Sequence, residues 1–287
     1  MLLYEDYVEE VRVFDKLGIR RESMASHLVP LQLTFKHGSD YFLIFPWADG
    51  NLKQFWKKKR PLRSQKKRVC WFLYQCWGIS RGLRKIHHLG TQMKSSSGGG
   101  DMLDGKNLPK MVLQPIAVDR EWGRHGDIKP ENILWFREHD GKPDHLVISD
   151  FGLTRFNSAQ SRSRVQQEQI PGFSGTYRPP DMHFDETISQ KYDVWSLGCV
   201  FLEFISWLLL GRKAVDNFVR ARIDDETEKQ SVAAEDKFFG IVDAGQGQQS
   251  PILKTSVVRV SGLEAFSPSS LTVKVNSGLV TDCYGGF

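Results

Sequence analysis

The chain has 287 residues, of which 40% are hydrophobic and 25% are charged, the composition of an ordinary soluble globular protein. The formal net charge of +5 is a mild excess, and much of it lies in one run, KKKRPLRSQKKR, from Lys57 to Arg68. No aromatic residue interrupts this run, which argues against a base-stacking surface for nucleic acid. A solvated loop is the simpler interpretation of the run, and a contact with phosphate, an acidic peptide or nucleic acid is the alternative.

The cysteines and the apolar runs indicate a protein of a reducing compartment. The four cysteines form no CxxC pair and no zinc-ligand spacing, so we expect buried thiols. Residues 1–20 carry several acids, among them Glu5, Asp6, Glu9 and Glu10, and no apolar core of a signal peptide. The longest apolar run, CVFLEFISWLLL (199–210), is short and contains Glu203, which predicts a buried helix instead of a membrane span. We therefore expect an intracellular protein, cytoplasmic or nuclear, that does not contact a membrane.

The N-terminal fifty residues predict one helix and two strands. Apolar residues recur at three- and four-residue spacing from Tyr4 to Leu17, which indicates a helix, and Gly18 follows as a stop. Two strand-like runs come next, at 27–35 and 41–45, joined by the turn-forming cluster KHGSD. The segment PWADG then interrupts the pattern.

A long helix and a low-complexity segment follow. Val69 to Leu89 is rich in Trp, Phe, Leu and Ile, and its two glycines, Gly78 and Gly82, indicate close packing because glycine weakens a helix. Residues 91–122 contain SSSGGGDMLDGKNLPK, which is typical of a flexible surface insert.

Regular structure is predicted again after the insert. The runs ILWF (133–136) and HLVIS (145–149) predict two short strands, joined by REHDGKPD with its Asp-Gly turn signal. Tyr192 to Leu210 predicts a long, strongly apolar helix. The sequence beyond Gly240 is poor in pattern, and we expect residues 241–287 to form an irregular or disordered tail.

The motif HGDIKPEN carries the groups that phosphoryl transfer to a hydroxyl requires. A carboxylate must orient the hydroxyl and take its proton, cations must neutralise the transferring group, and ligands must hold those cations. Asp127 supplies the carboxylate, Lys129 a cation and Asn132 an oxygen ligand suited to Mg²⁺. The motif SDFG adds Asp150 as a second ligand. The two predicted strands between these motifs would form a hairpin that places Asn132 beside Asp150.

These motifs resemble those of the eukaryotic protein kinases. HGDIKPEN followed by SDFG resembles the catalytic loop and the DFG motif. GTYRPPD (175–181) resembles the segment that ends in APE, and DVWSLG (193–198) resembles the start of the long buried helix of the large lobe. The Lys-Pro-Glu-Asn ending resembles the serine/threonine-specific subgroup, and the insert and Trp-rich helices resemble kinases of filamentous fungi. An aminoglycoside-phosphotransferase-like kinase is a rival that is not expected to carry DVWSLG or GTYRPPD.

The resemblance implies an α+β, two-lobe protein-kinase-like fold with an incomplete small lobe and a mainly helical large lobe. The small-lobe part would occupy residues 1–50, with the helix that carries the conserved glutamate, two strands and the hinge. The large lobe would occupy residues 51–240, with the flexible insert at about 91–122, and the tail would be 241–287.

The resemblance also implies a set of site residues and two cofactors, ATP and Mg²⁺. Asp127 would be the catalytic base, Lys129 the γ-phosphate contact, and Asn132 and Asp150 the metal ligands. Four residues of the small lobe would complete the nucleotide site: Glu10 as the helix glutamate, Phe45 at the gatekeeper position, and the backbone of Pro46 and Ala48 facing adenine. A regulatory spine would stack Phe14, Leu31, His125 and Phe151, anchored by Asp193.

Three features depart from the kinase pattern. Gly126 replaces the usual Arg, as in non-RD kinases, so phosphorylation at Ser161 or Ser163 is not expected to act through a catalytic-loop Arg. No glycine-rich loop and no strand Lys precede Glu10, which we expect to have no partner. Asp181 replaces the usual Glu, and no late helix is evident that could supply its Arg.

A smaller point of the pattern stays open between two residues. The residue that contacts Asp127 and Lys129 from the segment before GTYRPPD is either Ser174 or Thr176, because that segment is shorter than the common spacing.

Two functions are compatible with this sequence. The first is an ATP- and Mg²⁺-dependent serine/threonine protein kinase whose partners are ATP and a protein substrate, with no nucleic acid. The second is a catalytically impaired, kinase-like binding module. A chain that is a piece of a longer kinase, truncated at both ends, would account for the departures at its termini.

Overall fold

The computed structural model describes residues 4–19, 27–61, 65–88, 122–139, 141–157, 175–184, 189–225, 236–245 and 247–262. In chain order the elements are α1 (Tyr4–Leu17), β1 (Leu33–His37), β2 (Asp40–Ile44), β3 (Gly50–Asn51), α2 (Leu52–Lys58), α3 (Gln65–His87), β4 (Trp122–Arg124), β5 (Ile133–His139), β6 (Lys142–Ile148), β7 (Arg155–Asn157), α4 (Lys191–Leu210), α5 (Arg212–Ile223), β8 (Phe239–Gly245), β9 (Gln248–Leu253) and α6 (Thr255–Ser261). Two short 3₁₀ turns, Pro130–Asn132 and Pro180–His183, complete the set. This mixture of helix and sheet confirms the predicted α+β class.

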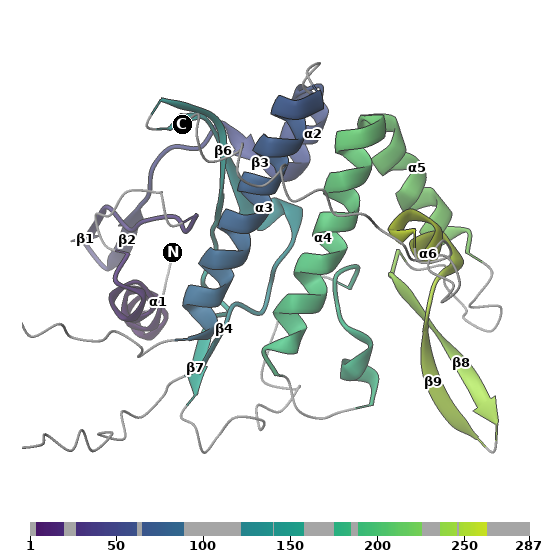
Figure 1. Ribbon diagram of the computed structural model, residues 1–287. Helices are drawn as coiled ribbons and strands as arrows, with labels where there is room; N and C mark the ends of the chain where they lie inside the picture. The colour runs from purple at the N-terminus through teal and green to yellow at the C-terminus, as the bar shows by residue number, and fades with distance from the viewer. Residues whose placement is uncertain are drawn as a thin grey trace, which may run out of the picture.

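The two long helices α3 and α4 run side by side through the middle of the molecule (Figure 1). The small α1 and β1–β2 unit lies on one side of them, and α5, α6 and the β8–β9 hairpin lie on the other. The sheet β3-β5-β6 is antiparallel, with β5 in its centre. Strand β4 pairs with β7, so the chain before the catalytic loop is bound to the chain after SDFG.

The N-terminal unit follows the prediction for its helix and departs from it in its first strand. Helix α1 has the predicted bounds, and Gly18 ends it with φ of +60°. Strand β1 begins at Leu33 instead of residue 27, because the preceding residues pair elsewhere. Leu28 forms a parallel bridge with Ile148, and the Val29 N–H donates to the Ile148 carbonyl at 2.8 Å. These residues are buried, so they join the N-terminal unit to the central sheet.

An aromatic core holds α2, α3 and α4 together. Phe55 of α2 packs against Trp71 of α3 and Trp207 of α4, with ring centroids 5.6 and 5.1 Å apart. The Trp207 Nε1–H also donates to the Trp56 carbonyl at 3.2 Å, which satisfies the indole where it is buried. These contacts fix the end of α4 beside α2.

The close packing expected at Gly78 is confirmed. A Cβ built on Gly78 would lie 2.1 Å from Nε2 of His27, a side chain that is only 2% exposed. The His27 Nδ1 lies 2.7 Å from the Leu146 carbonyl, which holds the ring in place. Glycine is therefore required here, because no side chain fits between α3 and this imidazole.

Helix α4 has the length and apolar composition to cross a membrane, and it is the only described helix of which this is true. In this fold just over half of that apolar window, 56%, is buried inside the protein. Its buried face carries Glu203, Phe204 and Trp207, which contact other elements of the protein. The helix therefore has the packing of a core helix, as predicted.

The predicted irregular tail is wrong for residues 241–261. Strands β8 and β9 form an antiparallel hairpin with one register shift between Asp243 and Gly245, and α6 follows it. Val257 of α6 packs in a second hydrophobic cluster with Cys199 and Phe218, so this region has a core. Residues 263–287, almost all of the predicted insert 91–122, Ser161, Ser163 and Ser174 lie outside the described residues.

Candidate active site

The β5–β6 hairpin brings the two predicted metal ligands together. Ile133 pairs with Ile148, so Asn132 lies opposite the residue that precedes Asp150. The Ser149 N–H and its Oγ both donate to the Asn132 carbonyl, at 2.9 and 3.0 Å. This geometry confirms the juxtaposition that was expected from the two strands between the motifs.

Asp127 is the centre of the polar contacts in the catalytic loop. Its Oδ2 lies 2.6 Å from the Lys129 Nζ and accepts a hydrogen bond from the Asn132 Nδ2 at 2.8 Å. The same Nδ2 also donates to the Asp127 carbonyl at 2.9 Å. Asp127 is only 8% exposed, so a cation and a carboxamide hold its carboxylate in one orientation.

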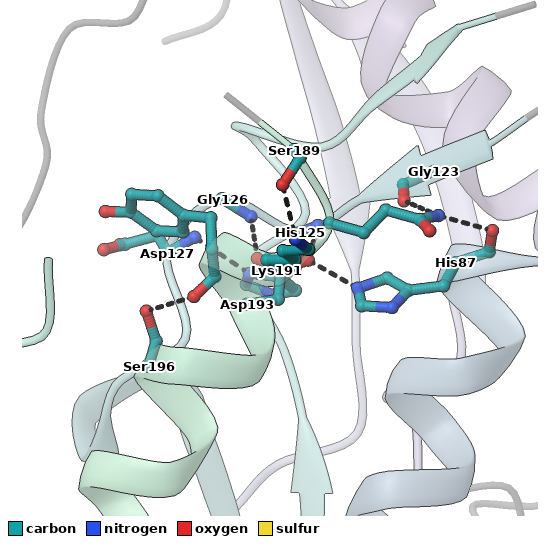
Figure 2. A network of polar contacts seen from close by, with 11 residues as sticks. His87, Gly123, His125, Gly126, Asp127, Ser189, Lys191, Asp193 and Ser196 are labelled. Atoms are coloured by element: carbon teal, nitrogen blue, oxygen red, sulfur yellow. Dashed lines mark hydrogen bonds and ion pairs between the residues drawn. The ribbon is translucent and has the colours of Figure 1, made fainter. Parts of the chain in front are cut away.

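A buried carboxylate, Asp193, holds the catalytic loop against the start of α4 (Figure 2). Its two oxygens accept from the backbone N–H groups of His125 and Gly126, each at 2.8 Å. Its Oδ2 also lies 2.8 Å from the His87 Nε2. Burial acts to raise the pKa of Asp193, but the hydrogen bonds from His87 and from the Gly126 backbone hold that pKa below its ordinary value. The anchoring role expected of Asp193 is therefore borne out by its contacts.

His125 and Gly126 have structural reasons for their identities. The His125 Nδ1 accepts from the Asp127 N–H at 3.2 Å, and its Nε2 donates to the Ser149 carbonyl at 3.0 Å. The ring thus links the catalytic loop to the strand that leads into Asp150. Gly126 has φ of +87°, a conformation that side chains rarely adopt, and a Cβ there would lie 3.3 Å from the Leu153 carbonyl oxygen. Any other residue at position 126 would be strained.

The predicted aromatic stack is formed. Phe151 meets Phe14 edge to face with ring centroids 5.2 Å apart, and it meets His125 at 5.6 Å. Phe14 also contacts Phe45, at 5.5 Å. Leu31 is buried in the same hydrophobic cluster. Phe151 therefore packs inward beneath α1, and Asp150 next to it is exposed.

The small-lobe residues lie near this stack, with one correction. Glu10 is half-buried on α1 and takes part in an interaction, so the expectation that it has no partner is wrong. Pro46 and Ala48 are half-buried. Their backbone groups form no hydrogen bond with the backbone of another described residue. The next backbone donor, Asp49 N–H, is taken by the Trp135 carbonyl at 2.9 Å.

The donor set at Asn132 and Asp150 fits a divalent cation such as Mg²⁺. Asn132 uses its Nδ2 toward Asp127, which leaves the amide oxygen Oδ1 without a partner among the described residues. Asp150 is exposed and has φ of +64°, a backbone conformation that costs about 1 kcal/mol or more for a residue other than glycine. Hard oxygen donors at the adjoining ends of β5 and β6 suit Mg²⁺.

A second polar network lies below the segment GTYRPPD and was not predicted. The Arg222 Nη2 donates to Glu203 at 2.7 Å, and its Nε donates to Asp236 at 2.7 Å. The guanidinium is fully buried between two rings, 4.3 Å from the centroid of Phe218 and 4.1 Å from that of Phe238. One sequence signal could have found it: Glu203 is a lone acid in a 12-residue apolar run, and a buried acid needs a buried partner.

The same network joins GTYRPPD to α4. The Tyr177 hydroxyl donates to Glu203 at 2.9 Å, and the Ser196 hydroxyl donates to the Tyr177 carbonyl at 2.8 Å. Asp181, which replaces the Glu of the kinase pattern, is exposed and forms no ion pair with any described residue. The contacts of Tyr177 with Glu203 and Ser196 therefore hold this segment against α4.

Comparison with known proteins agrees with this geometry. Residues 121–240 match the family model of the protein kinase domain. This segment, which is less than half of the chain, therefore resembles a eukaryotic protein kinase domain. The catalytic loop, the SDFG motif and the long buried helix all lie within the matched segment.

Individual kinases match parts of the chain. Cyclin-dependent kinase 7 of Dictyostelium discoideum is 36% identical over 104 residues, which are 36% of this chain and 26% of that protein. Mitogen-activated protein kinase 4 of Oryza sativa subsp. japonica is 25% identical over 219 residues, 74% of this chain and 46% of that protein. A probable inactive receptor kinase of Arabidopsis thaliana is 37% identical over 82 residues, 29% of this chain and 11% of that protein. The matched part of the chain thus spans less than half the length of each of these relatives.

Proposed function

We propose that this kinase domain transfers the γ-phosphate of ATP to a serine or threonine hydroxyl of a protein, with Mg²⁺ as the metal. The observation that supports the proposal is the convergence of Asp127, Lys129 and Asn132 in one hydrogen-bonded cluster beside Asp150. A base, a cation and two oxygen ligands in one place are what phosphoryl transfer requires. Two of the matched relatives are named as a cyclin-dependent kinase and a mitogen-activated protein kinase, which supports the proposal.

Each residue has a defined part in this proposal. Asp127 orients the acceptor hydroxyl and takes up its proton, because a buried, fixed carboxylate is a suitable base. Lys129, 2.6 Å from Asp127, contacts the γ-phosphate and neutralises the charge that develops on it. Asn132 and Asp150 hold Mg²⁺, which when bound neutralises the phosphate oxygens and positions them.

The small-lobe side of the nucleotide site rests on four further residues. The Pro46 carbonyl and the Ala48 backbone face adenine, and Phe45 limits the depth of the pocket behind them. Glu10 on α1 is the helix carboxylate that would position a phosphate-binding cation. The non-RD character proposed from Gly126 agrees with its left-handed backbone, which disfavours an arginine there.

A second function, a kinase-like module that binds partners without catalysis, is favoured by one surface. The β1–β2 hairpin exposes four apolar residues on one face, where Leu33 pairs with Ile44 and Phe35 with Phe42. The two Phe rings stack at 4.8 Å and are 43% and 38% exposed. Exposed apolar patches of this kind mark interaction surfaces, and one of the matched relatives is named as probably inactive.

Metal-dependent nucleotide binding separates the two functions. Titration of a fluorescent ATP analogue with and without Mg²⁺ should show metal-dependent binding if the chain is a kinase. Asp150→Asn should remove most of that metal dependence, and Asp144→Asn, which changes an aspartate away from the site, should leave it unchanged. Binding that is absent or indifferent to Mg²⁺ would support the binding module.

A further inference from the structure

A pocket of about 640 Å³ opens beside the catalytic loop. Helices α2 and α5 form its walls, and both lie at the same end of α4 (Figure 1). Lys129 lines the pocket, whereas Asn132 and Asp150 do not. Thr176 and Tyr177 also line it, so the pocket lies where the catalytic loop and the GTYRPPD segment meet. A protein substrate that brings its hydroxyl to Asp127 comes within reach of this pocket, because Lys129 lines it and lies 2.6 Å from Asp127.

The two carboxylates Glu203 and Asp236 inside the pocket share one buried cation. Glu203 and Asp236 both bind the buried Arg222, each at 2.7 Å. Glu203 also accepts the hydrogen bond from the Tyr177 hydroxyl. Both acids are therefore already engaged within the protein, and together with Arg222 they keep a single negative charge.

The cations at the rim of the pocket are not all balanced. Lys53 pairs with Glu131 at 2.8 Å, and Arg212 pairs with Asp216 at 3.6 Å. Two more cations, Lys57 on α2 and Arg220 on α5, line the pocket, are exposed, and form no ion pair with any residue that the structure describes. The rim thus has an excess of positive charge.

The walls between these charges are apolar. Trp56 lines the pocket on α2, and Val215 and Val219 line it on α5. Apolar walls with a few convergent charges are typical of a site that binds one side chain specifically. The Trp56 indole Nε1–H is buried and has no hydrogen-bond partner in the described residues.

We infer that this pocket receives an acidic or phosphorylated side chain of the protein substrate, next to the serine or threonine that Asp127 engages. The inference rests on the proposed kinase function and names the substrate class of that site. Lys129 lines the pocket and lies 2.6 Å from Asp127, so the anionic residue is within a few positions of the acceptor hydroxyl. Lys57 and Arg220 bind the anion, and their two positive charges outweigh the single charge left on Glu203 and Asp236 by Arg222.

Peptide binding measured without nucleotide tests the inference directly. Four fluorescein-labelled peptides, identical apart from the positions that flank one serine, carry Glu, phosphoserine, Gln or Lys there. At low salt the chain should bind the Glu and phosphoserine peptides about three- to tenfold more tightly than the Gln peptide, because exposed ion pairs contribute little each. Added salt should reduce this preference. The ratio between the Glu and phosphoserine peptides distinguishes a carboxylate from a phosphate as the preferred anion.

Matched variants locate the anion. The double variant K57Q/R220Q should bind all four peptides alike, whereas K213Q, which removes an exposed cation of α5 that does not line the pocket, should keep the preference. Equal binding of the Glu and Gln peptides by the unmodified chain would overturn the inference, and so would tighter binding of the Lys peptide. A preference that survives K57Q/R220Q would place the anion outside this pocket. Because ATP is absent, these results do not depend on whether the chain transfers phosphate.

Discussion

Removal of Arg222 should destabilise the fold through the carboxylate that it leaves behind. Arg222→Met keeps a long side chain between the rings of Phe218 and Phe238 but deletes the cation. Glu203, whose side chain is 3% exposed, then keeps only the hydrogen bond from Tyr177. Asp236 is 26% exposed, so water can replace its lost partner.

The expected loss in the free energy of unfolding follows from the burial of the Arg222–Glu203 pair. Removal of one partner of a buried ion pair costs about 3–5 kcal/mol, because the other charge stays buried and unpaired. The matched control, Arg212→Met, breaks a pair with Asp216 at 3.6 Å whose side chains are 54% and 51% exposed, and should cost less than about 0.5 kcal/mol. The double variant E203Q/R222M removes the orphaned charge, so it should recover much of the loss.

The loss of stability in Arg222→Met should become larger as pH rises. Burial already raises the pKa of Glu203 above its ordinary value of 4.5, although Arg222 opposes the shift. Without Arg222 the pKa rises further, so the folded variant binds a proton that the unfolded chain has released. Its stability therefore falls as pH rises above about 4.5, by up to about 1.4 kcal/mol per pH unit.

Urea denaturation followed by tryptophan fluorescence measures these differences at several pH values. The reasoning is refuted if Arg222→Met costs no more than Arg212→Met, or if E203Q/R222M is no more stable than Arg222→Met at neutral pH.

Three further predictions concern packing, pH and backbone strain. Gly78→Ala should destabilise the fold by about 1–3 kcal/mol, because its Cβ would overlap His27. Gly198→Ala on α4, whose Cβ would meet nothing within 4 Å, should stabilise the fold by about 0.5–1 kcal/mol. Urea midpoints that shift in the same direction for both variants would contradict this. Burial lowers the pKa of His27 from 6.5 to about 3, so between these pH values only the unfolded chain takes up a proton. The free energy of unfolding should therefore decrease as pH is lowered from 6.5, by up to about 1.4 kcal/mol per pH unit. His27→Gln should lack this part of the acid sensitivity, and parallel stability curves from pH 6.5 to 4 would disprove it. Gly126→Ala should cost about 1–2 kcal/mol because φ is +87°, and a thermal midpoint equal to that of the wild type would count against it.

Local pattern was sufficient to predict the elements that carry the site. Helix α1 and the β5–β6 hairpin follow from periodicity and turn signals in a few neighbouring residues, so their placement near the predicted positions is expected. The pairing of Asn132 with the strand before Asp150 follows from that hairpin alone. The catalytic cluster could therefore be predicted from short segments.

Contacts between distant segments could not be predicted in this way. Leu28 pairs with Ile148 across 120 positions, and no local pattern distinguishes that bridge from an extension of β1. Arg222 meets Glu203 because α4 and α5 fold back on each other. The only sequence signal for this pair was the position of Glu203 as a lone acid in an apolar run. The β8–β9 hairpin was missed because its strands are partly exposed and poor in apolar alternation.

Phosphoryl transfer by the chain and by Asp127→Asn tests the central proposal most directly. Purified protein is incubated with Mg²⁺ and ATP labelled in the γ-phosphate, together with a serine-containing peptide that carries flanking acids. The proposal predicts label on the peptide serine, and a rate that falls about 10²–10⁴-fold in Asp127→Asn while Mg-ATP binding is unchanged. Equal rates for the two proteins, or bound Mg-ATP with no transfer by either, would contradict a catalytic role for this site.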